Sequence, residues 1–289
     1  MTSPAATRAL PDALRLGAVH LRVADLERSL DWYQRALGLR RTGEAELGDG
    51  VETLVHLHED EEARPAGRHA GLYHYALLFP TREELARAAM RLSATQTRVQ
   101  GMSDHATHEA IYLPDPDGNG IELAADRPRE RWPSDAYAGG PAPLDLDSLL
   151  ATVSGEEPAP EVAEGLRVGH MHLHVGDVDE ALAFYRDVLG FELQANIGTA
   201  AFVSAGGYHH HLAVNVWKGR GVGPAPPHSA GLDHWTIQLP HDDDVAEVRA
   251  RVEAADLEVE PIERGFRVRD PWLITLTVES VPSRRLPGS

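Results

Sequence analysis

The sequence repeats one pattern twice, as VHLRVADLERSLDWYQRALGL at residues 19–39 and as MHLHVGDVDEALAFYRDVLGF at residues 171–191. A second pair of similar segments follows each copy, GLYHYALLFP at residues 71–80 and GLDHWTIQLP at residues 231–240. The copies begin roughly 150 residues apart, which is a common length for one domain. The repeat therefore predicts two related halves in this chain of 289 residues.

Histidines occupy matching positions in the two halves: His20 and His74 in the first, His172 and His234 in the second. The halves differ at a third position, because LPDPDGNGIELA contains Glu122, whereas the closest aligned residue of VRDPWLITLTV is Thr275. Two imidazoles with one carboxylate suit a divalent metal with open coordination positions, typically Fe(II). The pattern predicts a metal site of His20, His74 and Glu122. A secondary site, without an anion, is predicted at His172 and His234.

The composition excludes several classes of function. A net charge of -18 with 27 basic residues that form no runs argues against a nucleic-acid groove. The chain has no cysteine, so any metal must bind to nitrogen and oxygen. No apolar run approaches the roughly 18 residues that a membrane span needs, and the N-terminal sequence lacks a secretory apolar core. We therefore expect a cytoplasmic protein with no nucleic-acid or membrane partner.

Local patterns predict the same order of elements in each half. VHLRV at residues 19–23 alternates apolar and polar residues, which predicts a strand with His20 on its polar face. Asp25 is the predicted N-cap of a helix that ends at Gly38. Residues 72–79 predict a strand and 81–92 a helix, and AIYLP and IELA predict a hairpin around DPDGNG. The fold class is therefore α+β, with four βαβββ modules that form two similar cupped mixed-sheet domains.

The domain boundaries follow from composition. We expect a disordered N-terminus at residues 1–12, an N-terminal domain of two modules at 13–126 and a C-terminal domain of two modules at 166–280. Residues 127–165 are rich in Pro, Gly and acids and predict a linker, and residues 281–289 predict a tail.

Two acidic segments imitate cation sites. DPDGNG resembles the start of a calcium loop, but its flanks predict strands instead of helices, so a tight strand connection is preferred. HDDD at residues 241–244 precedes a helical pattern, and acids at a helix N-terminus are an ordinary feature of that position.

The pattern HLxVxDLxxSLxWYxxxLGL, the DPDGNGIEL hairpin and the four-module layout resemble the vicinal oxygen chelate superfamily, which includes glyoxalases, bleomycin resistance proteins and extradiol dioxygenases. Within it, the chain resembles the catechol 2,3-dioxygenase-like branch over residues 17–278. The resemblance implies a metal site with one His from the opening strand of each of two modules and a Glu from a final strand. These match His20, His74 and Glu122.

The resemblance also implies acid–base residues. In the better-known extradiol enzymes the active site lies in the C-terminal half and includes a histidine from a His–His pair on a strand. In GGYHHHLAV, His210 matches that histidine, and His209 and His211 are predicted to point to the opposite face of the strand. Tyr112 matches the site tyrosine, and His105 matches a histidine that contacts substrate. We expect the chemistry in the N-terminal half, because Glu122 anchors its metal.

These observations lead to a functional hypothesis with two alternatives. The leading hypothesis is a metal-dependent extradiol ring-cleavage dioxygenase that takes a small aromatic diol and dioxygen, with Fe(II) as the metal and Mn, Ni or Zn as other options. A metal isomerase or lyase of the glyoxalase or epimerase kind is one alternative, and a non-enzymatic aromatic-ligand-binding protein is the other. The sequence leaves a homo-oligomer open, although four modules in one chain can complete both cups without a partner.

Overall fold

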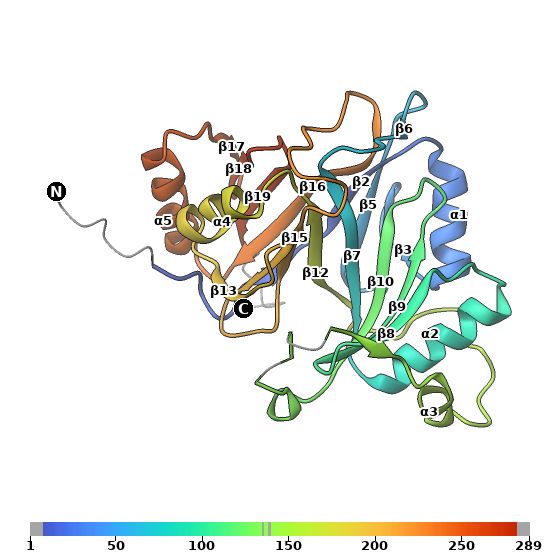
Figure 1. Ribbon diagram of the computed structural model, residues 1–289. Coiled ribbons are helices and arrows are strands. Elements are labelled where there is room, and N and C mark those ends of the chain that lie inside the picture. The colour runs from blue at the N-terminus through green and yellow to red at the C-terminus, as the bar shows by residue number, and fades with distance from the viewer. Residues whose placement is uncertain (1–7, 135, 138–139, 282–289) are drawn as a thin grey trace, which may run out of the picture.

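The computed structural model describes residues 8–134, 136–137 and 140–281, and it has the predicted α+β architecture of four βαβββ modules (Figure 1). The first module contains β2 (Val19–Val23), α1 (Leu26–Leu37), β3 (Arg40–Arg41), β4 (Glu46–Gly48) and β5 (Thr53–Glu59). The second contains β7 (Gly71–Phe79), α2 (Arg82–Ala94), β8 (Gly101–Asp104), β9 (His108–Pro114) and β10 (Gly120–Asp126).

The second half repeats this order. The third module contains β12 (Arg167–His174), α4 (Val178–Leu182) with its π-helical continuation Ala183–Val188, β13 (Glu192–Asn196), β14 (Ala200–Ser204) and β15 (Leu212–Asn215). The fourth contains β16 (Ser229–Leu239), α5 (Asp242–Ala254), β17 (Glu260–Ile262), β18 (Gly265–Arg269) and β19 (Thr275–Ser280). Short elements lie outside the modules: β1 (Arg15–Leu16), β6 (Arg64–Pro65), η1 (Arg129–Arg131), β11 (Ala142–Pro143) and α3 (Leu146–Ala151).

Local signals place the helix boundaries where the sequence predicts them. The Asp25 side chain accepts a hydrogen bond from the Arg28 N–H at 2.9 Å and caps α1, and Gly38 ends that helix with a φ of 72°. HDDD begins α5, with His241 at the N-cap and the three aspartates in the first turn, as expected of acids at a helix N-terminus. DPDGNG connects β9 to β10, so the preference for a tight strand connection over a calcium loop is confirmed.

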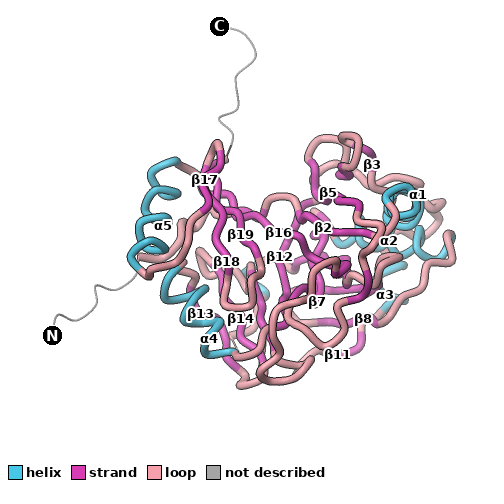
Figure 2. The backbone as a smooth tube through the Cα atoms, turned by 90° about the horizontal axis from the view of Figure 1, so that it is seen from above, coloured by secondary structure: helices cyan, strands magenta, loops and turns pink. Residues whose placement is uncertain are grey.

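Modules from different halves share each sheet. Sheet I joins the first and fourth modules in the order β17-β18-β19-β16-β2-β5-β4-β3, with β1 and β6 added to β16. Sheet II joins the second and third modules in the order β11-β8-β9-β10-β7-β12-β15-β14-β13. The helices of the two halves nevertheless lie on opposite sides of the molecule, α1, α2 and α3 on one side and α4 and α5 on the other (Figures 1 and 2). We expected each half to build its own cup, and this is wrong, because each opening strand pairs with an opening strand of the other half.

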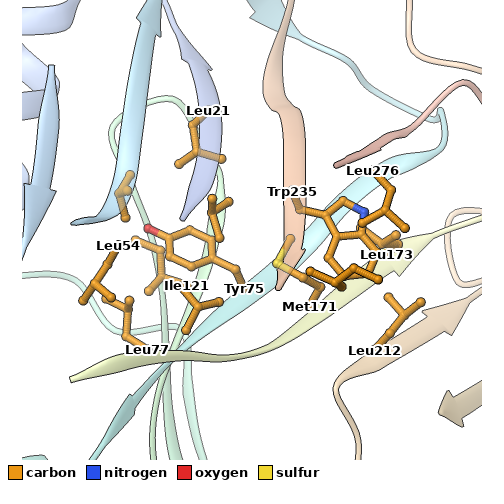
Figure 3. Packing of buried hydrophobic residues seen from close by; sticks show 14 of the residues in the cluster. Leu21, Leu54, Tyr75, Leu77, Ile121, Met171, Leu173, Leu212, Trp235 and Leu276 are labelled. Atoms are coloured by element: carbon orange, nitrogen blue, oxygen red, sulfur yellow. The ribbon is translucent and has the colours of Figure 1, made fainter. Parts of the chain in front are cut away.

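The apolar core lies between the two sheets. In the first half, Leu21 of sheet I and Tyr75 of sheet II lie toward each other, and in the second half Trp235 packs near Met171 (Figure 3). All four side chains are at most 1% exposed. Because side chains alternate along a strand, the neighbours of these residues face away from the core. Each sheet therefore has an outer face that is free to form a cup.

One tyrosine–aspartate contact ties the two modules of each half together. The buried Tyr33 hydroxyl of α1 donates to Asp115 Oδ2 at 3.0 Å, and the buried Tyr185 hydroxyl donates to Asp270 Oδ2 at 2.9 Å. The other oxygen of each aspartate accepts backbone N–H groups of its own turn. Burial raises the pKa of Asp270 to about 6, so this carboxylate depends on its donors.

The N-terminus and the predicted linker differ from expectation. Residues 1–7 and 282–289 lie outside the described residues, but residues 8–12 are described, and the expected disorder there is wrong. Leu10 is 2% exposed, and its N–H donates to the Gly190 carbonyl at 2.9 Å. The linker pairs β11 with β8 and buries Leu149, so it packs against sheet II and α2.

We expect Tyr185→Phe to lower the free energy of unfolding by about 1.5–3 kcal/mol, because it removes a hydrogen bond to a buried carboxylate and leaves that oxygen short of a donor. Tyr33→Phe is the matched variant in the other half and has the same expected sign. Urea denaturation followed by circular dichroism measures both. A change below about 0.5 kcal/mol in both variants would show that these contacts do not hold the modules together.

Candidate metal centre

Three side chains of sheet II converge on one point. His74 Nε2 lies 3.0 Å from Glu122 Oε2, His170 Nε2 lies 3.1 Å from the same oxygen, and the two ring nitrogens are 3.3 Å apart. All three side chains are buried. His74 and Glu122 come from the second module, and His170 comes from the third. Because sheet II contains strands from both halves, the cluster is made of residues from both halves.

The strand register explains this convergence. β10 pairs with β7 in parallel and places Glu122 opposite Ala76, two residues beyond His74 and on the same face. β12 pairs with β7 antiparallel, and His172 lies opposite His74. The register shifts between Val168 and Met171, where His170 is located. This irregularity lies beside Glu122 and brings His170 to its carboxylate.

The geometry fits a metal ion. Three ligand atoms bound at right angles about 2.1 Å from one ion must lie about 3.0 Å apart, close to the three observed separations. Glu122 Oε1 is buried and has no well-formed hydrogen bond, although His108 Nε2 lies 3.1 Å away. A buried carboxylate oxygen without a donor is costly unless a cation compensates it. The donor set of two imidazoles and one carboxylate is the one that Fe(II) accepts.

The protonation states of Glu122 and His170 suit metal binding. Burial acts to raise the pKa of Glu122, but the charge of His170 and the ring nitrogens of His108 and His74 outweigh it and hold this pKa well below its usual range. Burial lowers the pKa of His170 despite its contact with Glu122. The carboxylate is thus ionised, and His170 has a neutral form available as a ligand.

The predicted ligand His20 does not join this cluster. His20 lies on β2 in sheet I, where it pairs with His234 and not with His74. Its neighbour Leu21 faces the shared core, so His20 is on the outer face of sheet I. The predicted set of His20, His74 and Glu122 is therefore wrong in one member, and His170 stands in its place. The secondary pair His172 and His234 is also divided, because these residues lie in different sheets.

Glu122 has three structural counterparts, one in each other module. Each lies opposite the residue two places beyond the opening-strand histidine: Asn215 opposite His174, His58 opposite Arg22, and Thr277 opposite Thr236. Thr277, and not Thr275, is therefore the counterpart in the fourth module. Asn215 Nδ2 donates to His172 Nε2 at 2.9 Å, so this hydrogen bond takes up the nitrogen lone pair that a metal would need. Of the four equivalent residues, Glu122 is the one with a carboxylate.

His105 and Tyr112 lie together beside the cluster. Tyr112 is the cross-strand partner of Glu122, and its hydroxyl is 2.7 Å from His105 Nε2. Burial, with a further contribution from Glu122, raises the pKa of Tyr112. Burial and the nearby His108 lower the pKa of His105 to about 4. At neutral pH the pair is a protonated phenol and a neutral imidazole.

The three consecutive histidines, His209, His210 and His211, lie in a loop and not in a strand. Residues 205–211 precede β15, so the predicted alternation of His209, His210 and His211 is wrong. His210 contacts the cluster, with its ring centroid 4.2 Å from that of His170. His209 also turns inward and donates to Asp126 at 3.0 Å. His234 lies in the other sheet, so His210 does not face it.

A cavity of about 470 Å³ opens onto the cluster. Its walls are rich in aromatic side chains, namely Tyr73, Tyr112, Tyr137, Phe202 and Trp217. Tyr73 and Trp217 meet edge to face with ring centroids 5.4 Å apart, and both are partly exposed, so they lie at the mouth. The site is therefore a buried polar floor under aromatic walls, which is typical of a small-molecule pocket.

Sequence comparison defines the family. The sequence model of the Glyoxalase/Bleomycin resistance protein/Dioxygenase superfamily matches residues 15–123 and 167–271, one match in each half. The chain belongs to this superfamily. It is 43% identical over 268 residues to the catechol-2,3-dioxygenase of Bacillus subtilis (strain 168), a match that covers 89% of this chain and 93% of that protein.

Solved structures share the fold. A putative dioxygenase from Bacillus subtilis matches with a TM-score of 0.64 at 13% identity, over 96% of this chain and 87% of that one. Glyoxalase I from Zea mays matches with a TM-score of 0.57 at 15% identity, over 93% of this chain and 92% of that one. Within the described part of the chain, helices are too short or too polar to cross a membrane.

Two residues of the site were not predicted from the sequence. His170 was missed because the repeat aligns His172 with His20 and leaves His170 outside the pattern. The alternation of His170, His172 and His174 in VGHMHLH was the available signal, since it places all three on one face of a strand. His108 starts β9 close to Glu122, and no local pattern marks it.

We expect chelator-treated protein to lose stability as the pH falls from 6.5 toward 4. Burial lowers the pKa of His105 and His209 to about 4 and that of His211 to about 3, so the unfolded chain takes up these protons first. Asp115 and Asp270, whose pKa values burial raises, act in the opposite direction, but the buried histidines with lowered pKa values outnumber these two groups. Thermal melting at a series of pH values measures the slope.

His211→Gln should make that slope shallower, because the protonated His211 ring could no longer accept the Ala205 N–H at Nδ1. The exposed His241, at the start of α5, provides the matched control His241→Asn, which should leave the slope unchanged. A melting temperature that stays constant or rises from pH 6.5 to 4.5 would contradict the burial of neutral histidines.

Proposed function

We propose that this protein is an extradiol ring-cleavage dioxygenase that acts on a catechol-type aromatic diol with Fe(II) held by His74, His170 and Glu122. The observation that carries the proposal is the triangle of these three ligand atoms, with edges of 3.0, 3.1 and 3.3 Å. Fe(II) held by these three residues would supply open coordination positions for the diol and for dioxygen. Ring cleavage next to the hydroxyl pair then adds both atoms of dioxygen to the diol and gives a hydroxymuconic semialdehyde.

The residues around the triangle supply the proton chemistry. His105 is neutral at pH 7, because burial lowers its pKa to about 4, and it can accept a proton from a diol hydroxyl that chelation has made acidic. Tyr112 donates to His105 and can pass that proton between the substrate oxygen and the ring. His210 lies against His170 and fixes the orientation of this ligand.

The walls and the relatives favour the same substrate class. Tyr73, Phe202 and Trp217 present aromatic surfaces to the cavity, which suit a planar aromatic ring. A volume of about 470 Å³ accommodates a substituted single ring. The B. subtilis relative, which is 43% identical, is named a catechol-2,3-dioxygenase, and this supports a diol as the substrate.

We expect Glu122→Gln to abolish dioxygen uptake with catechol and to remove most of the Fe(II) that the wild type retains, because the amide cannot neutralise the ion. An oxygen electrode and metal analysis of anaerobically loaded protein measure the two effects. The exposed His241 offers the control His241→Asn, which should keep both. His170→Asn should lose iron, whereas His172→Asn should retain it, since Asn215 already occupies His172.

Two outcomes would move the assignment. Loss of iron in His172→Asn but not in His170→Asn would replace one ligand of the proposed set. Fe(II)-loaded protein that consumes no dioxygen with any catechol would exclude the dioxygenase. Turnover of a keto-hydroxy compound with Zn or Ni would then indicate an isomerase.

His105→Asn should lower kcat for catechol by roughly 10²-fold, because it removes the base without removing a metal ligand. Retained iron should stay at the wild-type level, and this separates loss of the base from collapse of the site. Tyr112→Phe is the companion variant and should give a smaller loss. If His105→Asn left kcat within about twofold of the wild type, the base would have to be another residue.

A further inference from the structure

The outer face of sheet I carries a second histidine cluster, which the dioxygenase site does not use. His20 comes from β2, and His56 and His58 come from the neighbouring strand β5. His56 and His58 are two residues apart on one strand, so they share a face, and His20 is the direct cross-strand partner of His56. The register of two parallel strands thus brings three imidazoles together.

The distances suit a shared cation. His20 Nδ1 lies 2.9 Å from His58 Nε2, and one ligand nitrogen of each of the three rings lies within 4.8 Å of the others. The ring centroids of His56 and His58 are 4.5 Å apart. We propose that His20, His56 and His58 form a second metal site, separate from the dioxygenase centre, which binds Zn²⁺ or a similar cation of the kind that imidazole nitrogen prefers.

The donor set decides the class of cation. The three imidazoles suit Zn, Cu or Ni better than a hard cation, and three histidines with a water molecule form an open zinc site. The Asp233 carboxylate also comes within 4.8 Å of His58, but its two oxygens are already paired with His234 at 2.8 Å and with Arg22 at 2.7 Å. The dioxygenase centre differs because Glu122 gives it the carboxylate that Fe(II) accepts. His58 stands at the position in the first module that Glu122 holds in the second. The two cups of one scaffold therefore differ in the same ligand position.

Neighbouring groups hold these rings in place. Glu46 is the cross-strand partner of His56, and its Oε1 lies 3.9 Å from His56 Nδ1, beyond hydrogen-bond distance. His234 of β16 stacks on His20 with ring centroids 3.8 Å apart. Burial, together with His234, lowers the pKa of His20 to about 3, so this ring is neutral at pH 7 as a ligand must be.

Zinc retention in a Glu122→Gln background tests the site without the other centre. Tag-free protein is stripped with chelator, loaded with zinc chloride, dialysed against metal-free buffer and analysed for zinc. We expect about one zinc per chain in Glu122→Gln and almost none in Glu122→Gln with His56→Asn or with His58→Asn. Glu122→Gln with His241→Asn is the matched control and should keep its zinc. Visible absorption of Co(II)-loaded protein reports the same site through its intensity.

Equal zinc retention in Glu122→Gln and in its His56→Asn and His58→Asn double variants would overturn the proposal, as would a Glu122→Gln protein that retains none. Circular dichroism of the metal-free variants separates loss of the site from loss of the fold, and the milder His56→Gln replaces any variant that fails to fold. The result is independent of the dioxygenase, because Glu122→Gln has already removed that centre. Failure here would leave the iron site and its dioxygen uptake unaffected.

Discussion

The antiparallel pairing of β7 with β12 determines where the candidate metal centre is located. It sets His172 opposite His74 and carries His170 to within 3.1 Å of Glu122, across the boundary between the halves. Without β12, the buried carboxylate of Glu122 would lose one hydrogen-bond partner. The desolvation free energy left uncompensated would be a large part of the small net stability of a typical fold. The same pairing fixes the inner face of sheet II, where Tyr75 and Met171 join the core. One strand register therefore sets both the core packing on the inner face of sheet II and the cluster on its outer face.

Much of the fold follows from local sequence. The alternation at residues 19–23, the Asp25 cap and the Gly38 stop each have a local physical cause, so their predictions are confirmed. The choice of sheet partner has no local cause. The opening strands of all four modules have similar alternating patterns, and the sequence of one module does not determine which other opening strand will pair with its own. Sequence analysis therefore placed His74 and Glu122 correctly in one module but joined them to His20, which pairs with the other half.

Duplication explains why the two cups look alike and why they differ. Both have paired histidines on their central strands, His74 with His172 in sheet II and His20 with His234 in sheet I. The backbone register repeats, and the side chain at one position of the final strand changes the chemistry. Glu122 supplies charge to sheet II, and His58 supplies a further imidazole to sheet I. One scaffold can in this way carry two candidate metal sites with different preferences, one in each cup.

The most direct test of this account is anomalous diffraction at the iron edge from crystals of protein loaded anaerobically with Fe(II) alone. The account predicts a strong iron peak in contact with His74, His170 and Glu122, with ligands contributed by both halves of the chain. An iron peak that lacks Glu122 as a ligand, or one that lies among the histidines of sheet I instead, would contradict it.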